Sequence, residues 1–121
     1  MHDDTRGAVA YIAGCATNEM SKSSIFDYSA EVHRSLTGTI THVRASVHDH
    51  TTGAQISGSG AGGSYNLFHY GHGSHISLNK ESGGNYSGFD YATGSHFSIT
   101  VSGNNVTVYD YGAGRHYQYS L

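Results

Sequence analysis

Phe89-Asp90-Tyr91-Ala92-Thr93-Gly94-Ser95-His96 is the stretch that decides the fold. Residues 91–93 have the composition of a type I turn, and Gly94 follows where a G1 bulge needs a residue in the left-handed region. Glycine is favoured at that position because a positive φ brings no Cβ clash. The stretch therefore predicts a β-hairpin whose two strands meet at this turn.

The same pattern occurs five times along the chain. Each copy has a short triplet of aromatic, acidic or histidine residues, and the third residue of the triplet can serve as its mark. The marks are separated by 22, 20, 21 and 20 residues: Tyr28, His50, Tyr70, Tyr91 and Tyr111. A glycine lies three residues after the mark in every copy but the first, which has Glu31. This period predicts five hairpin repeats.

The repeats predict an all-β domain over residues 23–121. The turns at the other ends of the hairpins are also glycine-rich, as at 82–85 and 102–105, so we expect an antiparallel meander of about ten short strands. A sheet with one apolar face must close into a barrel, fold as a sandwich, or pack on another copy. An open sheet would favour a homo-oligomer, whereas a barrel closed by the last strand, 116–121, would remove the free edges.

The direction of the side chains follows from how each turn pairs its strands. If the residue before the mark pairs with the residue five after it, as Asp90 would with His96, the two share a face. The polar face then holds Asp27, Asp49, His69, Asp90 and Asp110 with His33, Gln55, His75, His96 and His116. The core face holds Phe68, Phe89, Tyr109, Ile76, Phe97, Tyr117, Leu78, Ile99 and Tyr119.

The rows of aspartate, histidine and serine do not predict an enzyme. A catalytic triad needs a unique, asymmetric site with an oxyanion hole. Residues that recur at one position of every repeat are more simply explained as shaping the turns, and the chain has no G-x-S-x-G segment. We expect a protein without catalytic activity.

The third hairpin breaks the pattern in a way that suggests a metal site. Histidine replaces aspartate at His69, His72 lies in the turn, and His75 is the expected cross-strand partner of His69. Imidazole nitrogens at such spacing can bind zinc, copper or nickel. A small metal-binding or pH-responsive protein is therefore an alternative function, and otherwise we expect no cofactor.

The tyrosines of the repeats suggest a second kind of site. Equivalent turns lie on one edge of a meander, so they form a row of rings that can stack on sugars or pack against another protein: Tyr28, Tyr70, Tyr91 and Tyr111. The alternative is that these rings cap the core. A further alternative function, a barrel that carries a small apolar ligand, would need an internal cavity that the large core residues leave little room for.

Residues 1–22 lie outside the repeats. Ile12-Ala13-Gly14-Cys15 resembles the lipobox of bacterial lipoproteins, which implies lipidation of Cys15 and a polar tether after it. Alternatively, the apolar run 8–15 is an extra strand or a short helix that covers an edge of the sheet.

Length and composition bound the function. The 121 residues fit one domain, and the single cysteine cannot form an internal disulfide. Only 12% of residues are charged and the net charge is −3, so we expect no nucleic-acid partner. No apolar run approaches the ~20 residues of a transmembrane helix. The leading hypothesis is a non-catalytic domain, secreted or in the bacterial envelope, that binds a glycan or a surface protein or assembles with itself; otherwise it is cytoplasmic.

Overall fold

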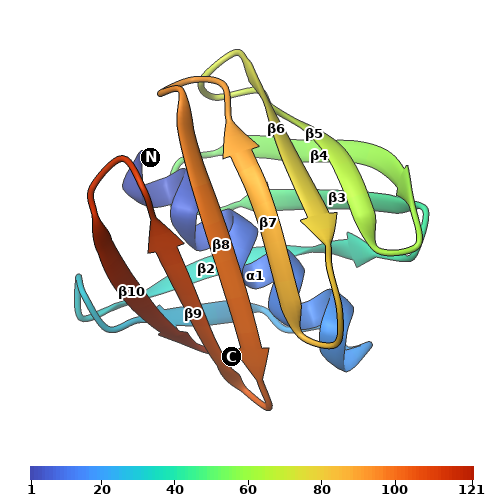
Figure 1. Cartoon of the computed structure of the whole chain (residues 1–121), viewed down its shortest axis with the longest axis horizontal. Helices are drawn as coiled ribbons and strands as arrows, with labels where there is room; N and C mark the ends of the chain where they lie inside the picture. Colours follow the sequence, from blue (N-terminus) through green and yellow to red (C-terminus); the bar gives the residue numbers. More distant parts are fainter.

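The computed structural model describes residues 1–121 as a ten-stranded β-barrel wound around one helix (Figure 1). Its elements are α1 (Asp3–Asn18), β1 (Ser24–Asp27), β2 (Val32–Ile40), β3 (Arg44–Asp49), β4 (Ala54–Ala61), β5 (Ser64–His69), β6 (Ser74–Lys80), β7 (Asn85–Asp90), β8 (Ser95–Ser102), β9 (Asn105–Asp110) and β10 (Arg115–Ser120). No helix has the length and hydropathy that crossing a bilayer requires.

Every strand pairs antiparallel with its neighbours in the sequence, and β10 returns to pair with β1. The predicted all-β meander of five hairpins is confirmed. Of the two predicted architectures, barrel and sandwich, the chain adopts the barrel. The last strand closes it, as expected, so the open sheet on which a homo-oligomer was predicted does not occur. The closing seam is short, because β1 and β10 share two residue pairs where β9 and β10 share six.

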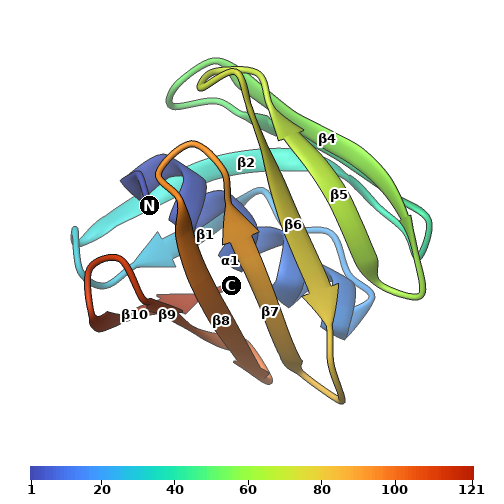
Figure 2. The same cartoon turned by 45° about the horizontal axis from the view of Figure 1, so that its top comes forward.

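The interior of the barrel is filled by α1 (Figure 2). Every residue from Thr5 to Cys15 is buried, and the helix joins the inward side chains of the strands in one core of 24 residues. A helix that is apolar all round is stable only when it is enclosed on all sides. The alternative of an extra strand was therefore wrong, and the alternative of a helix was right in kind but wrong in place, since the helix fills the barrel. The space that an apolar ligand would need is occupied.

Small residues let the helix fit between the strands. A Cβ atom added to Gly14 would lie 2.9 Å from Cδ1 of Leu121 and 3.1 Å from Cγ2 of Val106. A Cβ atom on Gly7 would lie 2.7 Å from Cδ of Arg34. Both glycines thus face side chains that leave no room for a Cβ atom.

The predicted strand register was wrong by one residue at each turn that begins with a marked residue. Asp90 pairs with Ser95, and it is Phe89 that pairs with His96. A shift of one residue sends every side chain of a strand to the other face. The residues before the marks therefore point into the barrel and are buried, whereas we had placed them outside: Asp27, Asp49, His69, Asp90 and Asp110. Conversely, Phe68, Phe89 and Tyr109 are half-buried on the outer face.

The assignments for the strand that follows each turn were correct. Their inward side chains are buried as predicted: Ile76, Leu78, Phe97, Ile99, Tyr117 and Tyr119. Their outward side chains include the exposed His33, His75, His96 and His116 and the half-buried Gln55.

The buried aspartates are held by the turns themselves. Oδ1 of Asp110 accepts hydrogen bonds from the backbone N–H groups of Gly112 (3.0 Å) and Ala113 (3.3 Å). Asp49 accepts equivalent bonds from Thr51 (2.9 Å) and Thr52 (3.3 Å). An aspartate that bonds to the backbone two residues on is a standard way to stabilise a turn. Because these bonds satisfy one carboxylate oxygen, the repeated aspartates can lie inside the barrel.

Candidate functional site

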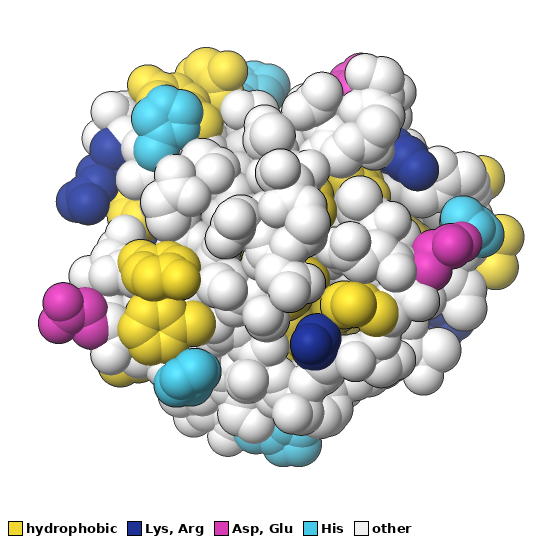
Figure 3. Space-filling view, turned by 90° about the horizontal axis from the view of Figure 1, so that it is seen from below, with side chains coloured by type: hydrophobic (Ala, Val, Ile, Leu, Met, Phe, Trp, Pro, Cys, Tyr) yellow, Lys and Arg dark blue, Asp and Glu magenta, His cyan; other side chains and the backbone are white.

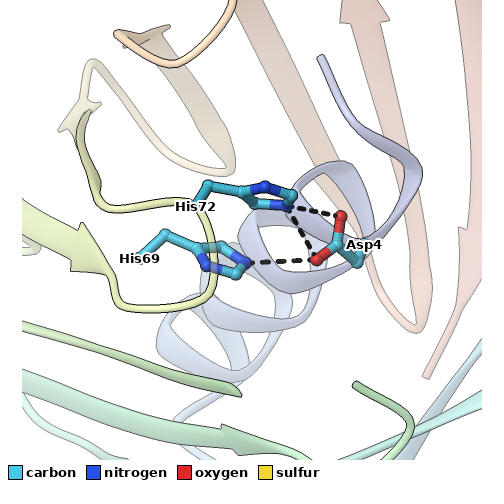
Figure 4. Close-up of side chains that lie close together, drawn as sticks. All are labelled: Asp4, His69 and His72. Carbon is cyan, nitrogen blue, oxygen red and sulfur yellow. Dashed lines mark hydrogen bonds and ion pairs between the residues drawn. The ribbon is translucent and has the colours of Figure 1, made fainter. Parts of the chain in front are cut away.

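A cluster of three polar side chains lies where the start of α1 meets the turn between β5 and β6 (Figure 4). Nε2 of His72 lies 3.0 Å from each carboxylate oxygen of Asp4, and Nε2 of His69 lies 3.4 Å from Oδ2 of Asp4. All three ligand-type atoms are within 4.8 Å of one another. The cluster thus combines the two imidazoles predicted from the third hairpin with a carboxylate from the helix.

His69 replaces the turn-forming aspartate in both position and bonding. Its Nδ1 accepts a hydrogen bond from the N–H of Gly71 at 3.1 Å, as an aspartate Oδ1 does in the other hairpins. The proton of the neutral ring therefore belongs on Nε2. That Nε2 is buried and makes no hydrogen bond, although it points toward Asp4.

Burial and charge shift the pKa values of two members of the cluster. Burial lowers the pKa of His69, and the nearby carboxylates of Asp4, Asp49 and Asp90 only partly oppose this effect. Burial would raise the pKa of Asp4, but the hydrogen bond and charge of His72, with the charge of His69, outweigh it and lower that pKa. The arrangement holds a carboxylate anion against two imidazoles.

The third predicted ligand, His75, does not belong to the cluster. It pairs with Phe68 and points outward, while His69 pairs with Ser74 and points inward. The reason is again the register of the turn, because residues 69 and 75 cannot share a face when 68 and 75 are opposite each other.

An aromatic belt runs around the barrel near the turns that carry the marks. In four hairpins the ring of the marked tyrosine packs edge-on against an aromatic ring two residues before it, at 4.7–4.8 Å, and that ring packs against a histidine of the next strand. In the second hairpin, His48 and His50 take the two aromatic places. The four sets are Tyr28–Phe26–His33, Tyr70–Phe68–His75, Tyr91–Phe89–His96 and Tyr111–Tyr109–His116.

The predicted row of tyrosines is thus on the outer surface and does not cap the core. Tyr28, Tyr70, Tyr91 and Tyr111 are 53–62% exposed. The backbone N–H of Tyr91 donates to the carbonyl oxygen of His75, and the N–H of Tyr111 to that of His96. Tyr91 and Tyr111 therefore each lie beside the histidine of the preceding hairpin, whereas the N–H groups of Tyr70 and Tyr28 donate to the carbonyl oxygens of Gln55 and Gln118.

Grooves lie between neighbouring hairpins along this belt, including the fifth and the first, which meet at the seam. One of about 540 Å³ is lined by His75 and Tyr91, and the next, of about 490 Å³, by His96 and Tyr111. A third, of about 400 Å³, is lined by Gln118 and Tyr28. We call these three the inter-hairpin grooves. Their other lining residues are mainly serine, asparagine and glycine, with Ile76, Phe89, Phe97 and Tyr119.

The face of the molecule shown in Figure 3 carries few charges. Small groups of hydrophobic side chains lie beside histidines, and uncharged polar surface separates the groups. The apolar surface is divided into small units instead of forming one broad patch. This distribution differs from that of a large protein–protein interface, whose core is continuous.

Cys15 lies in α1 with its side chain buried. Burial raises the pKa of its thiol, and burial also raises the pKa of its neighbour Tyr11 to about 12. A chain that began at Cys15 would lack most of the helix that fills the barrel. Lipidation of Cys15 stays a prediction.

Two features of the sites were missed from sequence. Asp4 has no motif in the sequence that connects it with the third hairpin, and only the path of α1 through the barrel brings it to His69 and His72. Phe26, Phe68, Phe89 and Tyr109 were expected in the core or left unassigned. With a turn of four residues, these aromatic residues pair with the exposed histidines of the following strands. That pairing would have placed them on the outer face.

No protein-family model, no curated protein and no solved structure matches the chain.

Proposed function

We propose that the protein is a non-catalytic binding domain whose aromatic belt recognises glycans. The observation that carries the proposal is the exposed tyrosine ring at the wall of each inter-hairpin groove. A sugar ring has an apolar face of C–H groups that packs on an aromatic ring, and hydroxyl groups around its edge that need hydrogen bonds. The grooves offer both kinds of contact.

Preorganisation of the tyrosines supports this role. The ring of Tyr91 is braced by Phe89 at 4.8 Å, and that of Tyr111 by Tyr109 at 4.7 Å. A braced ring loses little side-chain entropy when a ligand stacks on it. The polar neighbours of the second groove, Ser77, Asn79 and Ser98, can serve the hydroxyl groups of a sugar.

The shape and size of the grooves favour a glycan over a folded protein partner. The grooves are open to solvent and hold about 400–540 Å³ each, which suits a ligand that lies along the surface. Several similar grooves around one barrel can also engage a repeating polymer, because linked weak contacts raise overall affinity by roughly 10²–10⁴. A secreted or envelope protein could reach such polymers where they are displayed at the cell surface, so the proposal agrees with that location.

The test is a glycan array probed with the purified chain, followed by titration of any hit with the variants Tyr91→Ala and Tyr111→Ala. We expect each variant to weaken binding by about tenfold or more, the effect of losing one stacked ring worth ~1.5 kcal/mol. Val43→Ala is the matched control, since Val43 is 60% exposed and lines none of the three grooves.

A blank array would overturn the proposal. So would a hit whose affinity falls as much with Val43→Ala as with the tyrosine variants. Capture of a single envelope protein with no glycan attached, abolished by Tyr91→Ala, would instead assign the belt to a protein partner.

A further inference from the structure

The cluster of Asp4, His69 and His72 lies apart from the inter-hairpin grooves, inside the end of the barrel where α1 begins (Figure 4). Its spacing can be compared with that of a known coordination geometry. Tetrahedral zinc holds nitrogen and oxygen ligands at about 2.0–2.1 Å, which places neighbouring ligand atoms about 3.3 Å apart. The separations between the carboxylate and the two Nε2 atoms, 3.0 and 3.4 Å, are close to this value, and the two Nε2 atoms lie within 4.8 Å of each other.

His69 gives the cluster a buried ring nitrogen that makes no hydrogen bond. The residue is 1% exposed, and its Nε2 lies 3.4 Å from Oδ2 of Asp4, a contact without hydrogen-bond geometry. The other four hairpins have aspartate at the equivalent position, so the histidine needs an explanation of its own.

The charges around the cluster favour a bound cation. Asp27 pairs with Arg34, and Asp110 pairs with Arg6 and the terminal ammonium of Met1. Asp4, Asp49 and Asp90 make no ion pair with lysine or arginine, and Asp49 and Asp90 are buried at the equivalent positions of the hairpins on either side of His69. The imidazole of His2 stacks on His72 at 4.1 Å and adds no negative charge. This sector of the barrel thus concentrates carboxylates without a fixed counter-ion.

We propose that Asp4, His69 and His72 form a zinc site with two imidazole nitrogens, one carboxylate oxygen and an open fourth position. Two imidazoles and a carboxylate suit a borderline divalent ion better than calcium or magnesium, which prefer all-oxygen ligands. The metal would link the start of α1 to the β5–β6 turn, so it would hold the helix in register with the barrel.

Binding has a defined consequence at His69. Coordination through Nε2 moves the ring proton to Nδ1, so the N–H of Gly71 loses the acceptor that it has at 3.1 Å in the metal-free protein. No proton is gained or lost in this change of tautomer. The amide of Gly71 is therefore the reporter for the site, because an ion held elsewhere on the surface would leave its hydrogen bond intact.

The test uses the full chain, prepared without a histidine tag and titrated with zinc alone. We expect one equivalent to bind, the unfolding temperature to rise, and the Gly71 amide signal to move in a ¹H–¹⁵N spectrum. His72→Asn should weaken the affinity by at least about 100-fold, the upper range seen for loss of mere supporting groups around a metal. His69→Asn should do the same while its side-chain oxygen keeps an acceptor for Gly71.

His75→Asn is the matched control, because His75 belongs to the same hairpin but points outward. It should leave zinc affinity unchanged. Binding below one equivalent, a Gly71 signal that zinc does not move, or an equal loss with His75→Asn would overturn the proposal. If His69→Asn fails to fold, His72→Asn decides alone, since His72 is partly exposed in the turn.

Discussion

The first hairpin departs from the repeat pattern at a single residue of its turn, Glu31. Glu31 has a φ of 56° at the position where the other four hairpins have glycine, for example Gly94 at 68°. A side chain in this left-handed region carries a cost of roughly 1–2 kcal/mol, and Glu31 is exposed with no contact that would offset it. The first hairpin is therefore strained at its turn.

Replacing Glu31 by glycine should raise the free energy of unfolding by about 1 kcal/mol, because it relieves this strain. Urea denaturation followed by circular dichroism would measure the change. The reciprocal variant, Gly94→Glu, should lower stability by a similar amount. A loss of stability in Glu31→Gly would show that the glutamate contributes something other than strain.

The buried carboxylate of Asp110 should make stability depend on pH. Burial would raise its pKa, but hydrogen bonds and charge from the ammonium of Met1, the N–H of Ala113 and the guanidinium of Arg6 together hold that pKa below the ordinary value of 3.8. A lowered pKa contributes stability that is complete above the unfolded value and is lost as the pH falls through the folded value.

We therefore expect Asp110→Asn to unfold about 2 kcal/mol more easily at pH 7 and to lose less additional stability below pH 4 than the parent chain. The amide oxygen keeps the turn bonds to Gly112, so the variant removes mainly the charge. Denaturation at a series of pH values checks this. Asp3→Asn is the control, because Asp3 contacts Arg6 from an exposed position, and it should have little effect.

At the scale of elements, the hairpins could be predicted from the sequence, whereas the helix could not. The spacing of glycines and marked residues identified ten strands, since turn chemistry is local. Residues 8–15 lack the polar face by which a helix is usually recognised, because α1 is enclosed on every side. The faces of β5, β7 and β9 were reversed because the residue before each mark was expected to pair with the histidine five residues after the mark, whereas Phe68, Phe89 and Tyr109 make these pairs. Asp4 joined His69 only through tertiary packing.

The fit of α1 within the barrel should be sensitive to added bulk. Gly14→Val places new methyl groups against Leu121 and Val106, and overpacking of this kind costs roughly 1–3 kcal/mol. Ala16→Val is the control, because Ala16 is half-buried beyond the fully buried segment of the helix. Thermal unfolding should show a marked fall for Gly14→Val only. Helix propensity alone would favour Gly14→Val and disfavour Ala16→Val, so an equal fall in both variants would contradict the packing argument.

At the scale of the whole molecule, the five hairpins depend on one another through the shared helix and the closing strand. Tyr119 is fully buried, and its neighbour Ser120 pairs with Phe26 across the seam. A chain of independent repeats would tolerate loss of its last strand, but a closed barrel cannot, because the loss uncovers its core.

Deleting residues 117–121 should therefore abolish cooperative unfolding and resistance to proteolysis. Tyr119→Phe is the matched control: it keeps the ring and removes a buried hydroxyl that makes no hydrogen bond, so it should fold normally. A soluble deletion product with an unchanged melting profile would contradict the importance of the seam.

The two-pair seam between β1 and β10 also determines how water can reach the centre of the molecule. Backbone amides in the middle of α1 are surrounded by strands, so fraying of the helix alone cannot expose them to solvent. Deuterium can enter there only when the wall parts, and the seam is the part of the wall with the fewest bonds to break. Exchange at Tyr11 and Ile12 should consequently share one opening free energy with the amides of β1, while the centre of β8 stays protected longer.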